Sequence, residues 1–273
     1  MLRQAIIPLA GLGTRLLPFS SVMPKELLPI NGKSNLEHIL DECIEAGIKE
    51  FIFIISKKKE SIKKYFFNDQ FYKSILAKKK DKRIEASFKK LKSYQKMIKF
   101  VYQNKPKGTG DAILKCKKLI TASHFLMLFP DDLIIKKNCT AELISLHKKM
   151  KSSIIATKIV DKKSVSRWGI LSLKDKKKNY FRIKDIVEKP TIKKSPSNYA
   201  VIGRYILPKT IIGKLKNLKP GQGGEVHITD AIKKLIDDGE SFYGNIFKGK
   251  YLDCGTLNGY INSTLEISKE NKK

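Results

Sequence analysis

The first half of the chain alternates short apolar runs with longer amphipathic stretches. From Leu36 to Ile44, apolar residues recur at helical spacing and stop before Gly47. Strand, helix and strand in this order predict a crossover unit, and its repetition predicts a mostly parallel sheet with helices on both faces. Four runs are apolar almost throughout, which predicts strands buried on both faces: residues 5–9, 50–55, 98–102 and 125–129.

Two more helical sections are predicted in this half. Residues 56–96 form a lysine-rich section with an interruption near Asn68, and residues 111–119 are amphipathic. The strand at 125–129 ends at Pro130 and is followed at once by two aspartates. Ligands of open α/β sheets bind beyond the carboxyl ends of the strands, so we expect functional residues at such positions.

The pattern changes after Met150, where strand-like segments follow one another with short charged connections. A helix capped by Thr229 is predicted to run through Ile236 to Gly239, and a last helix from about Thr256 to Lys269. Neither a linker-like tract nor a repeat occurs. We therefore expect a single α/β domain, 1–273, with a mixed, mostly parallel sheet flanked by helices and halves at about 1–150 and 151–273, the latter smaller and β-rich. Its predicted strands are 154–160, 169–173, 181–187, 200–207 and 242–247.

The net charge of +30 is extreme, and it comes from lysine, because only six of the 56 basic residues are arginine. The lysines are spread along the chain, with clusters at 57–59, 78–80 and 176–178. A nucleic-acid-binding protein would more often show a basic stripe with an identifiable reading module, and the chain has none. Solvated lysine-rich faces are the simpler interpretation, although weak, salt-sensitive binding to polyanions is compatible with such a field.

The four cysteines, Cys43, Cys116, Cys139 and Cys254, lie far apart and form no metal-ligand pair. Their spacing favours a reduced compartment. The first residues enter a strand directly, without a charged and then apolar leader, and no run of about 18 apolar residues occurs. We expect a cytoplasmic protein that has no membrane partner.

The loop after the first strand holds Gly11, Gly13, Thr14 and Arg15, and Pro24-Lys25-Glu26 follows ten residues later. Glycines let backbone N–H groups approach a polyphosphate, while a hydroxyl and two cations add donors and charge. A dinucleotide-binding fingerprint would need a third glycine instead of Leu16, and a P-loop would need Gly-Lys-Ser/Thr. The segment therefore predicts a phosphate site of another kind.

Residues 4–30, QAIIPLAGLGTRLLPFSSVMPKELLPI, resemble the signature of the sugar nucleotidyltransferases, G-x-G-T-R-x-x-P followed by P-K-E-x-x-P. The wording AGLGTR and PKELLPI is most similar to the bacterial branch of UTP–glucose-1-phosphate uridylyltransferases, whereas thymidylyl- and adenylyl-transferring relatives usually begin G-G-x-G-T-R. The resemblance runs from about residue 3 to 266. It implies a Rossmann-like nucleotidyltransferase fold whose second half binds the sugar phosphate.

The resemblance also implies a nucleotide site. The backbone of the Gly-rich loop and the side chains of Thr14 and Arg15 would hold the phosphates, and Lys25 would neutralise charge on the α-phosphate and the departing pyrophosphate. An amide that offers a donor and an acceptor matches the imide edge of uracil, which would place Gln103 and the Gly108 backbone at the base. The nucleotide-binding residues implied in this way are Ala10, Gly11, Gly13, Thr14, Gln103 and Gly108.

Two aspartates far apart in sequence, Asp131 and Asp253, are implied as ligands of Mg²⁺, a hard cation that takes one or two carboxylates together with phosphate oxygens. Asp132 ranks lower, because the family usually has an apolar residue there. In the sugar half, Glu188 would accept hydrogen bonds from glucose hydroxyls and Lys189 would bind the sugar's phosphate. The implied sugar-binding residues are Gly169, Glu188, Lys189 and Gly203, and the implied catalytic residues are Arg15, Lys25 and Lys189.

Some positions depart from the family pattern. His227 stands where glutamine is usual, Ser34-Asn35 replaces a step that commonly contains proline, and Thr256-Leu257 replaces a polar or lysine-containing pair. The segment 224–230 corresponds to a family block that we expect to lie behind the residues that contact substrate.

The activity implied is transfer of UMP from UTP to α-D-glucose 1-phosphate, giving UDP-glucose and pyrophosphate. Three alternatives stay open: a same-fold enzyme that uses dTTP or another sugar 1-phosphate, a polyanion-binding protein suggested only by charge, and a regulatory relative that has lost catalysis. The last is disfavoured because both lysines and both aspartates are present. Relatives are commonly dimers or tetramers, so we expect a homo-oligomer.

Overall fold

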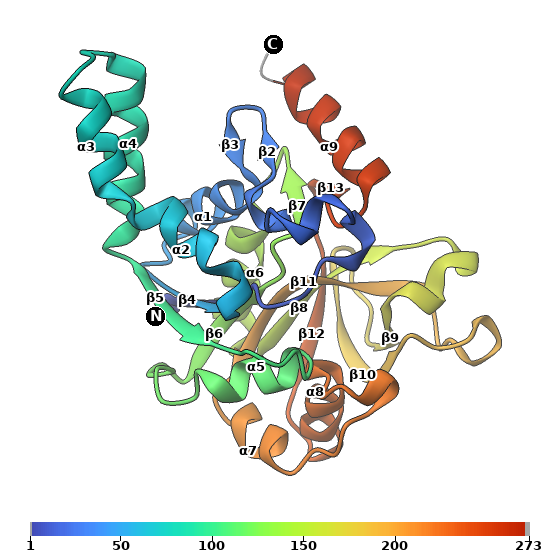
Figure 1. Cartoon of the computed structure of the whole chain (residues 1–273). Helices are drawn as coiled ribbons and strands as arrows, with labels where there is room; N and C mark the ends of the chain where they lie inside the picture. Colours follow the sequence, from blue (N-terminus) through green and yellow to red (C-terminus); the bar gives the residue numbers. More distant parts are fainter. Residues whose placement is uncertain (1, 271–273) are drawn as a thin grey trace.

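A mixed sheet of nine strands runs through the whole molecule (Figure 1), in a computed structural model that describes residues 2–270. In spatial order its strands are β5 (Ile98–Tyr102), β4 (Glu50–Ile55), β1 (Gln4–Pro8), β6 (His124–Leu128), β11 (Tyr199–Pro208), β8 (Ser153–Ile159), β12 (Phe242–Ile246), β10 (Tyr180–Glu188) and β9 (Gly169–Lys174). Two small antiparallel pairs accompany it, β2 (Pro29–Ile30) with β3 (Lys33–Ser34) and β7 (Asp132–Ile135) with β13 (Lys250–Asp253).

Strand direction divides the sheet into two parts. β5, β4, β1 and β6 are parallel, as the repeated strand–helix pattern predicted. From β11 onward the pairs are antiparallel, apart from the parallel β8–β12 pair. The predicted mixed α/β sheet is thus confirmed, but the prediction that it is mostly parallel is wrong: within residues 2–270 four of its strand pairs are parallel and five are antiparallel. The second half pairs mainly in the antiparallel direction. β11 pairs with β6 on one side and β8 on the other, so it joins the two parts.

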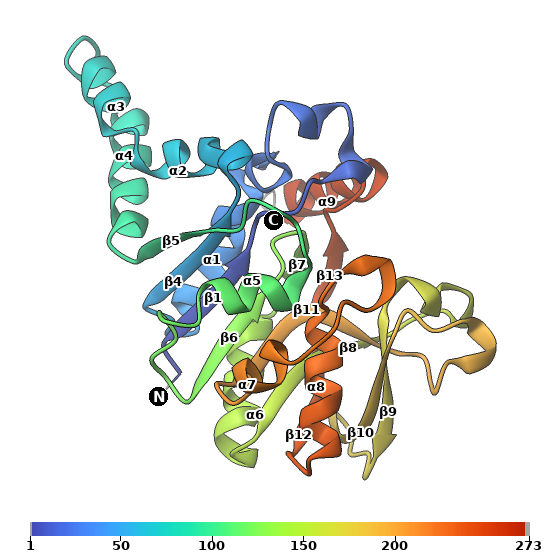
Figure 2. The same cartoon turned by 60° about the horizontal axis from the view of Figure 1, so that its bottom comes forward.

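Helices cover both faces of the sheet (Figure 2). Their bounds are α1 (Asn35–Glu45), α2 (Glu60–Phe67), α3 (Asp69–Leu76), α4 (Lys82–Gln95), α5 (Thr109–Lys115), α6 (Cys139–Met150), α7 (Ile211–Lys216), α8 (Ile228–Asp237) and α9 (Leu257–Glu270). α1 and α6 pack on one face, and α5, α7 and α8 pack on the other. Helices α3 and α4 stand out from the body as a hairpin.

The alternation of side chains along β4 explains why these strands are apolar throughout. Phe51, Phe53 and Ile55 enter the core on the α1 side, while Ile52 and Ile54 enter the core on the α5 side. Side chains alternate between the two faces of a strand, so a strand covered on both faces needs apolar residues at every position.

Ser34, one of the departures from the family pattern, begins α1. Its hydroxyl accepts a hydrogen bond from the Glu37 N–H at 3.2 Å, and the Glu37 carboxylate accepts one from the Ser34 N–H at 2.9 Å. This reciprocal pair is a capping box, which satisfies two backbone donors that the first helical turn leaves free. The substitution therefore has a local structural purpose.

Several helical predictions need correction. The predicted helix at 111–119 begins at Thr109 and ends at Lys115, because residues 116–119 form a tighter turn in which the Leu119 N–H donates to the Cys116 carbonyl at 2.8 Å. The lysine-rich section breaks near Asn68 as predicted, and breaks again at 77–81. Helices α6 and α7 were not predicted. No helix in the described range is long and apolar enough to span a bilayer.

Candidate active site

Two adjoining cavities open beyond the carboxyl ends of the central strands. The first has a volume of about 380 Å³ and is lined by Ala10, Gly11, Lys25, Gln103 and Gly108, among others. The second measures about 280 Å³, and its lining includes Gly169, Glu188, Lys189, Gly203 and Asp253. Five residues line both cavities and form the wall between them: Arg15, Thr109, Phe129, Asp131 and Glu225. The structure thus brings together most residues implied by the family resemblance, at the predicted edge of the sheet.

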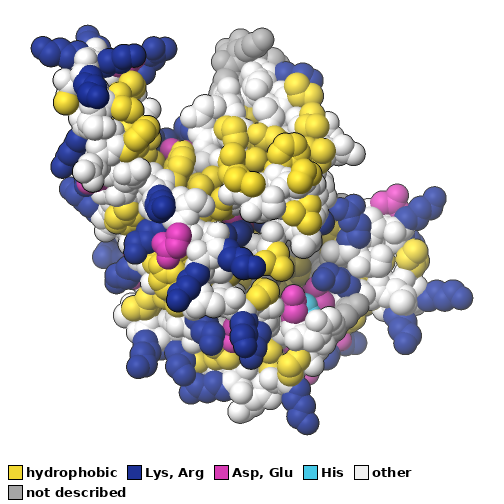
Figure 3. All heavy atoms as spheres, in the orientation of Figure 1, with side chains coloured by type: hydrophobic (Ala, Val, Ile, Leu, Met, Phe, Trp, Pro, Cys, Tyr) yellow, Lys and Arg dark blue, Asp and Glu magenta, His cyan; other side chains and the backbone are white. Residues whose placement is uncertain are grey.

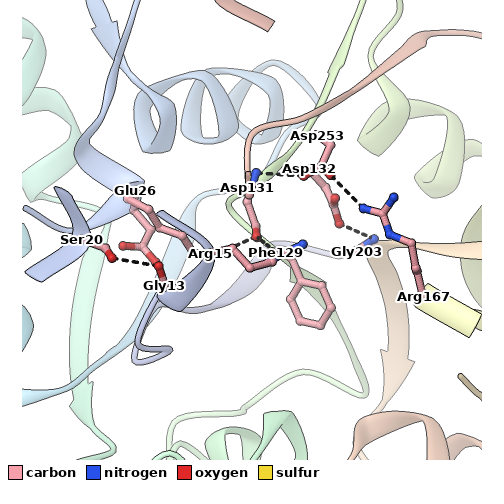
Figure 4. A network of polar contacts seen from close by, with 12 residues as sticks. Gly13, Arg15, Ser20, Glu26, Phe129, Asp131, Asp132, Arg167, Gly203 and Asp253 are labelled. Atoms are coloured by element: carbon pink, nitrogen blue, oxygen red, sulfur yellow. Dashed lines mark hydrogen bonds and ion pairs between the residues drawn. The ribbon is translucent and has the colours of Figure 1, made fainter. Parts of the chain in front are cut away.

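The loop after β1 is held in a compact turn. Gly13 has a φ of 70°, a conformation that favours glycine, and its carbonyl accepts a hydrogen bond from the Ser20 hydroxyl at 2.8 Å (Figure 4). Ala10 and Gly11 line the first cavity. Gly13 and Thr14 do not line either cavity, and the Thr14 side chain is exposed.

Asp131 is the point where the cationic side chains meet. The Lys25 ammonium donates to its Oδ2 at 2.5 Å, and Nη2 of Arg15 lies 3.5 Å from the same oxygen. Lys25 is provided by a short 3-10 turn, η3 (Lys25–Leu27), and Arg15 by another, η1 (Thr14–Leu16). Lys25 lines the first cavity, while Arg15 lines both. Two cations, Lys25 and Arg15, therefore lie where the cavities join.

These groups remain charged because of their mutual attraction. Burial alone would raise the pKa of Asp131, but the Lys25 ammonium, a backbone hydrogen bond and the Arg15 charge together hold the pKa below its ordinary value. Burial would lower the pKa of Lys25, yet the carboxylates of Asp131 and Glu26 together raise it. The Lys25 ammonium therefore keeps its positive charge at neutral pH.

The small β7–β13 pair brings Asp253 beside the Asp131-Asp132 segment. In its register Asp253 lies opposite Asp132, and the Cys254 N–H donates to the Asp131 carbonyl at 2.8 Å. Gly255 follows, where a Cβ would stand 2.7 Å from both Nη2 of Arg15 and Oδ2 of Asp131, and 3.1 Å from Oδ1 of Asp253. Figure 4 shows the three aspartates together between the Gly13 loop and Arg167.

The carboxylates beside Gly255 are of the kind that bind a hard divalent cation. Oxygens of Asp131 and Asp253 flank the position of a Cβ at residue 255, and Nη2 of Arg15 lies 2.7 Å from the same position, so an ion there would take the place of this guanidinium. Within residues 2–270, no cluster of three or more histidine, cysteine or acidic side chains could hold a metal on its own. Mg²⁺ usually takes one or two carboxylates and completes its coordination with phosphate oxygens and water. The donor set therefore fits a cation shared with a phosphorylated substrate.

Gln103 lies at the end of β5 and is only 4% exposed. Its side-chain NH₂ group donates to the Gly108 carbonyl at 3.1 Å and to Oδ2 of Asp111 at 2.8 Å. Both donors are therefore used inside the protein, and only the carbonyl oxygen of the amide remains to face a base. Gly108 has a φ of 98°, and a Cβ there would lie 2.5 Å from the Val226 carbonyl oxygen.

The second cavity is built around the end of β10. Oε2 of Glu188 accepts a hydrogen bond from the Thr229 hydroxyl at 3.0 Å, and Oε1 lies 3.7 Å from the Lys189 ammonium. Gly169 pairs with Glu188 across the β9–β10 ladder, and a Cβ at this glycine would stand 3.3 Å from Oε2. Lys189 has a φ of 44°, and its N–H donates to the Trp168 carbonyl at 3.0 Å.

Thr229 does not cap α8, which corrects the sequence prediction. The helix begins at Ile228, its N-cap is His227, and the Ile228 N–H donates to the Thr109 hydroxyl at 3.0 Å. The Thr229 hydroxyl is then free to bind Glu188. Ser and Thr are common caps, so the sequence favoured the local role over a contact 41 residues away.

Asp132 supports the second cavity in a way that the sequence did not predict. Its Oδ2 accepts the Gly203 N–H at 3.0 Å, and its Oδ1 accepts the Tyr251 hydroxyl at 2.5 Å. Burial, with the nearby Asp131 charge, raises the pKa of Asp132 to about 6. The Gly203 N–H is thus already bound to Asp132. The lack of a side chain at Gly203 leaves room for the Asp132 carboxylate, since a Cβ would stand 2.5 Å from its Oδ2.

The geometry agrees with comparisons to known proteins. Residues 4–270 match the family model described as nucleotidyl transferase. A Bacillus subtilis protein named UTP–glucose-1-phosphate uridylyltransferase is 34% identical over 99% of this chain and 92% of its own length. A Mycoplasma pneumoniae protein of the same name is also 34% identical, over 97% of this chain and 91% of its own length.

Solved structures give the same result. A UDP-glucose pyrophosphorylase complexed with UDP-glucose superposes with a TM-score of 0.87 at 33% identity, covering 99% of this chain and 100% of the other. A UTP-bound UGPase from Acinetobacter baumannii superposes with a TM-score of 0.89 at 29% identity, covering 99% and 94%. With matches over nearly its whole length in both sequence and fold, the chain belongs to the nucleotidyl transferase family.

Proposed function

We propose that this chain transfers UMP from UTP to α-D-glucose 1-phosphate, giving UDP-glucose and pyrophosphate. The observation that carries the proposal is the pair of adjoining cavities, whose shared wall contains Arg15 and Asp131 with Lys25 beside it. Two phosphorylated substrates that occupied one cavity each would meet beside the Arg15 and Lys25 cations. The relatives named for this activity match nearly the full chain.

In this reaction a phosphate oxygen of the sugar phosphate forms a bond to the α-phosphorus of UTP, and the bond from that phosphorus to the bridging oxygen breaks as pyrophosphate leaves. The nucleophile is already an anion, so no general base is needed. The difficulty is the approach of two polyanions, and Lys25, Arg15 and Lys189 lower its cost by fixed positive charge and positioning. One anhydride replaces another, so we expect the reaction to be readily reversible.

The first cavity is proposed to hold the nucleotide. Backbone N–H groups at Ala10 and Gly11 would approach the phosphates, and Gly13 and Thr14 would shape the loop behind them. Gln103 and the Gly108 backbone would face uracil, with the Gln103 carbonyl accepting the N3–H of the base, because its amide donors already bind the protein. An acceptor at this position would favour uracil or thymine over cytosine.

The second cavity is proposed to hold the sugar phosphate. Glu188, oriented by the Thr229 hydroxyl, would accept hydrogen bonds from glucose hydroxyls. Lys189 would bind the phosphate, and Gly169 and Gly203 would keep the floor of the cavity open for the ring. Each half of a single domain, 1–273, would thus contribute one substrate site.

Mg²⁺ is proposed to bind between Asp131 and Asp253. When bound there, the ion would neutralise phosphate charge and polarise the phosphoryl oxygens, an effect that can contribute several kcal/mol. The residues themselves fix the position of the two carboxylates: the Gly255 N–H donates to Oδ1 of Asp253 at 2.8 Å, and Lys25 holds Oδ2 of Asp131.

The direct test is pyrophosphate release by the purified protein with glucose 1-phosphate and Mg²⁺, with UTP, dTTP, ATP, GTP and CTP offered separately. We expect strong release with UTP. Release chiefly with dTTP would assign the chain to a thymidylyl-transferring branch, and no release with any nucleotide would contradict the proposal. Polyanion binding that persists at physiological salt would instead support the alternative suggested by the net charge.

Homo-oligomer formation is proposed to use an apolar patch that we call the α9 patch. It consists of exposed side chains from the loop after β1 and from one face of α9, and the two segments lie side by side (Figures 1 and 2). Figure 3 shows hydrophobic side chains gathered over both segments. The patch residues are Leu17, Phe19, Val22, Met23, Leu257, Ile261 and Leu265.

Charge supports a second copy of this chain as the partner. The segments 4–24 and 251–268 contain no lysine, although 56 of the 273 residues are lysine or arginine. Two chains of net charge +30 would repel each other less across this face than across a lysine-rich one.

The four cysteines are free and buried, which supports the proposed location in the reducing cytoplasm.

We predict that Val22→Asp with Ile261→Asp gives a smaller species in light scattering than the unchanged chain, because the substitutions place four carboxylates in each two-fold interface. Ile159→Asp is the matched control, since Ile159 is 58% exposed and lies on β8, outside the patch. An unchanged mass for the double variant would argue against this interface.

A further inference from the structure

Lys59 and Glu26 form a buried ion pair behind the first cavity. Lys59 is 7% exposed and Glu26 is 1% exposed. The Lys59 ammonium donates to both carboxylate oxygens of Glu26, each at 2.8 Å. Lysine and glutamate are almost never buried unless they are paired, so the two positions depend on each other.

The pair is tied to Lys25 through the backbone. Glu26 directly follows Lys25 in the 3-10 turn η3, and Lys59 comes from a different turn, η4 (Lys57–Lys59), after β4. The side chain of Lys25 reaches Asp131, and the side chain of Glu26 reaches Lys59. Two ion pairs therefore fix this three-residue turn: Lys25 pairs with Asp131, and the neighbouring Glu26 pairs with Lys59.

These contacts form a row of alternating charge: Lys59, Glu26, Lys25, Asp131 and Arg15. The Glu26 carboxylate contributes to the raised pKa of Lys25, after burial and Asp131. Glu26 also lines the first cavity. The row thus runs from the end of β4, through the turn that carries Lys25, to the wall shared by the two cavities.

Substrate binding would disturb only one of the two ion pairs. Phosphate oxygens that approach Lys25 compete with Asp131 for its ammonium, which weakens the contact that holds the turn on that side. The Lys59–Glu26 pair does not use the Lys25 ammonium, so phosphate binding to Lys25 leaves this pair intact. It can therefore keep the turn in place while the Lys25 ammonium changes partners.

We propose that Lys59 is a positioning residue that acts through Glu26 to hold the Lys25 turn at the junction of the two cavities. The inference rests on the proposed function of Lys25. A lysine displaced by a fraction of an ångström would still bind phosphate, but it would no longer face the reacting phosphorus correctly. Misplacement of a catalytic group by about 1 Å can cost about 100-fold in rate.

The test is a double-substitution cycle with Lys59→Met, Glu26→Gln and the two combined. Each single substitution should lower kcat about 10- to 100-fold, with a smaller change in KM for the nucleotide. Because the residues act as one unit, the combined variant should lose no more activity than either single one. It should be more resistant to thermal unfolding than Lys59→Met, because it no longer leaves a carboxylate buried alone.

Two further variants separate positioning from stability. Lys59→Arg keeps the charge and a donor to Glu26, so it should recover much of kcat. Glu37→Gln is the control: Glu37 is a carboxylate 6% exposed that binds Ser34 and Tyr65 and lines neither cavity, so its loss should lower the melting temperature and leave kcat near normal. If Lys59→Met does not fold, Lys59→Arg and Glu26→Gln still give the comparison.

Additive losses in the cycle would overturn the inference, as would recovery of kcat in step with stability in the combined variant. Rates are measured with whichever nucleoside triphosphate the unchanged enzyme uses. A failure of the proposed function therefore appears in the unchanged protein, whereas a failure of this inference appears only in the ratio of variant to unchanged enzyme.

Discussion

Lys25→Ala is expected to lower kcat about 100- to 1,000-fold, the loss typical when one preorganised charged donor is removed from an active site. The Lys25 ammonium lies 2.5 Å from Asp131, beside the wall shared by the two cavities, where phosphate charge of both substrates would gather. KM for both substrates should change much less than kcat, because binding also uses the loop backbone and Lys189. Steady-state kinetics with both substrates varied will measure the difference.

The structure refines the expected stability of this variant. The sequence alone suggested little effect on the fold, but Lys25 is the closest cation to a carboxylate whose side chain is only 16% exposed. Its loss should leave the fold intact and lower the free energy of unfolding by about 2 kcal/mol, less than for a fully buried pair. Lys33→Ala is the control, since Lys33 pairs with Asp41 and lines neither cavity. Near-normal turnover by Lys25→Ala would refute the role proposed for it.

Asp253→Asn is expected to lower kcat about 100-fold at low Mg²⁺ and to recover part of the loss as Mg²⁺ is raised. The amide keeps the size of the side chain and can still accept the Gly255 N–H, but it removes one of two anionic ligands at the proposed metal site. Chelation of divalent ions should abolish the activity of the unchanged enzyme. A titration of rate against Mg²⁺ checks both expectations.

Asp185→Asn serves as the matched control for this experiment. Asp185 lies on β10, forms an ion pair with Lys233, and lines neither cavity. Its substitution should leave the Mg²⁺ dependence unchanged. If Asp253→Asn shows the same Mg²⁺ dependence as this control, the assignment of Asp253 to the metal is wrong.

Much of the fold could be predicted because its signals are local. Along β4 every residue from Phe51 to Ile55 is buried, so the strand reads as an unbroken apolar run. Helix α6 was missed because two of its buried positions, Cys139 and Thr140, carry small side chains that give a weak hydrophobic signal, and because its last turn, from His147 to Met150, is mostly polar. Asn138, which caps α6 by accepting the Ala141 N–H, was the available clue.

The candidate site, too, could be predicted only where its signals are local. Gly-rich loops and residues that directly follow strands could be identified from order and spacing. Contacts between distant segments could not: Thr229 with Glu188, Asp132 with Gly203, and Lys59 with Glu26. Each depends on a register or a turn that places two polar groups together in the interior. A buried lysine looks the same in sequence as the many lysines on the surface.

The continuity of the sheet through β11 also limits how this enzyme can move. β11 is bonded to β6 of the parallel part and to β8 of the antiparallel part, so rotating one half against the other would break a ladder of backbone hydrogen bonds. Enclosure of the reactants cannot then come from a hinge between lobes. We expect it to come from segments above the sheet, residues 9–23 of the loop after β1 and the stretch at 219–227, while the Lys25 turn and the sheet beneath keep their positions.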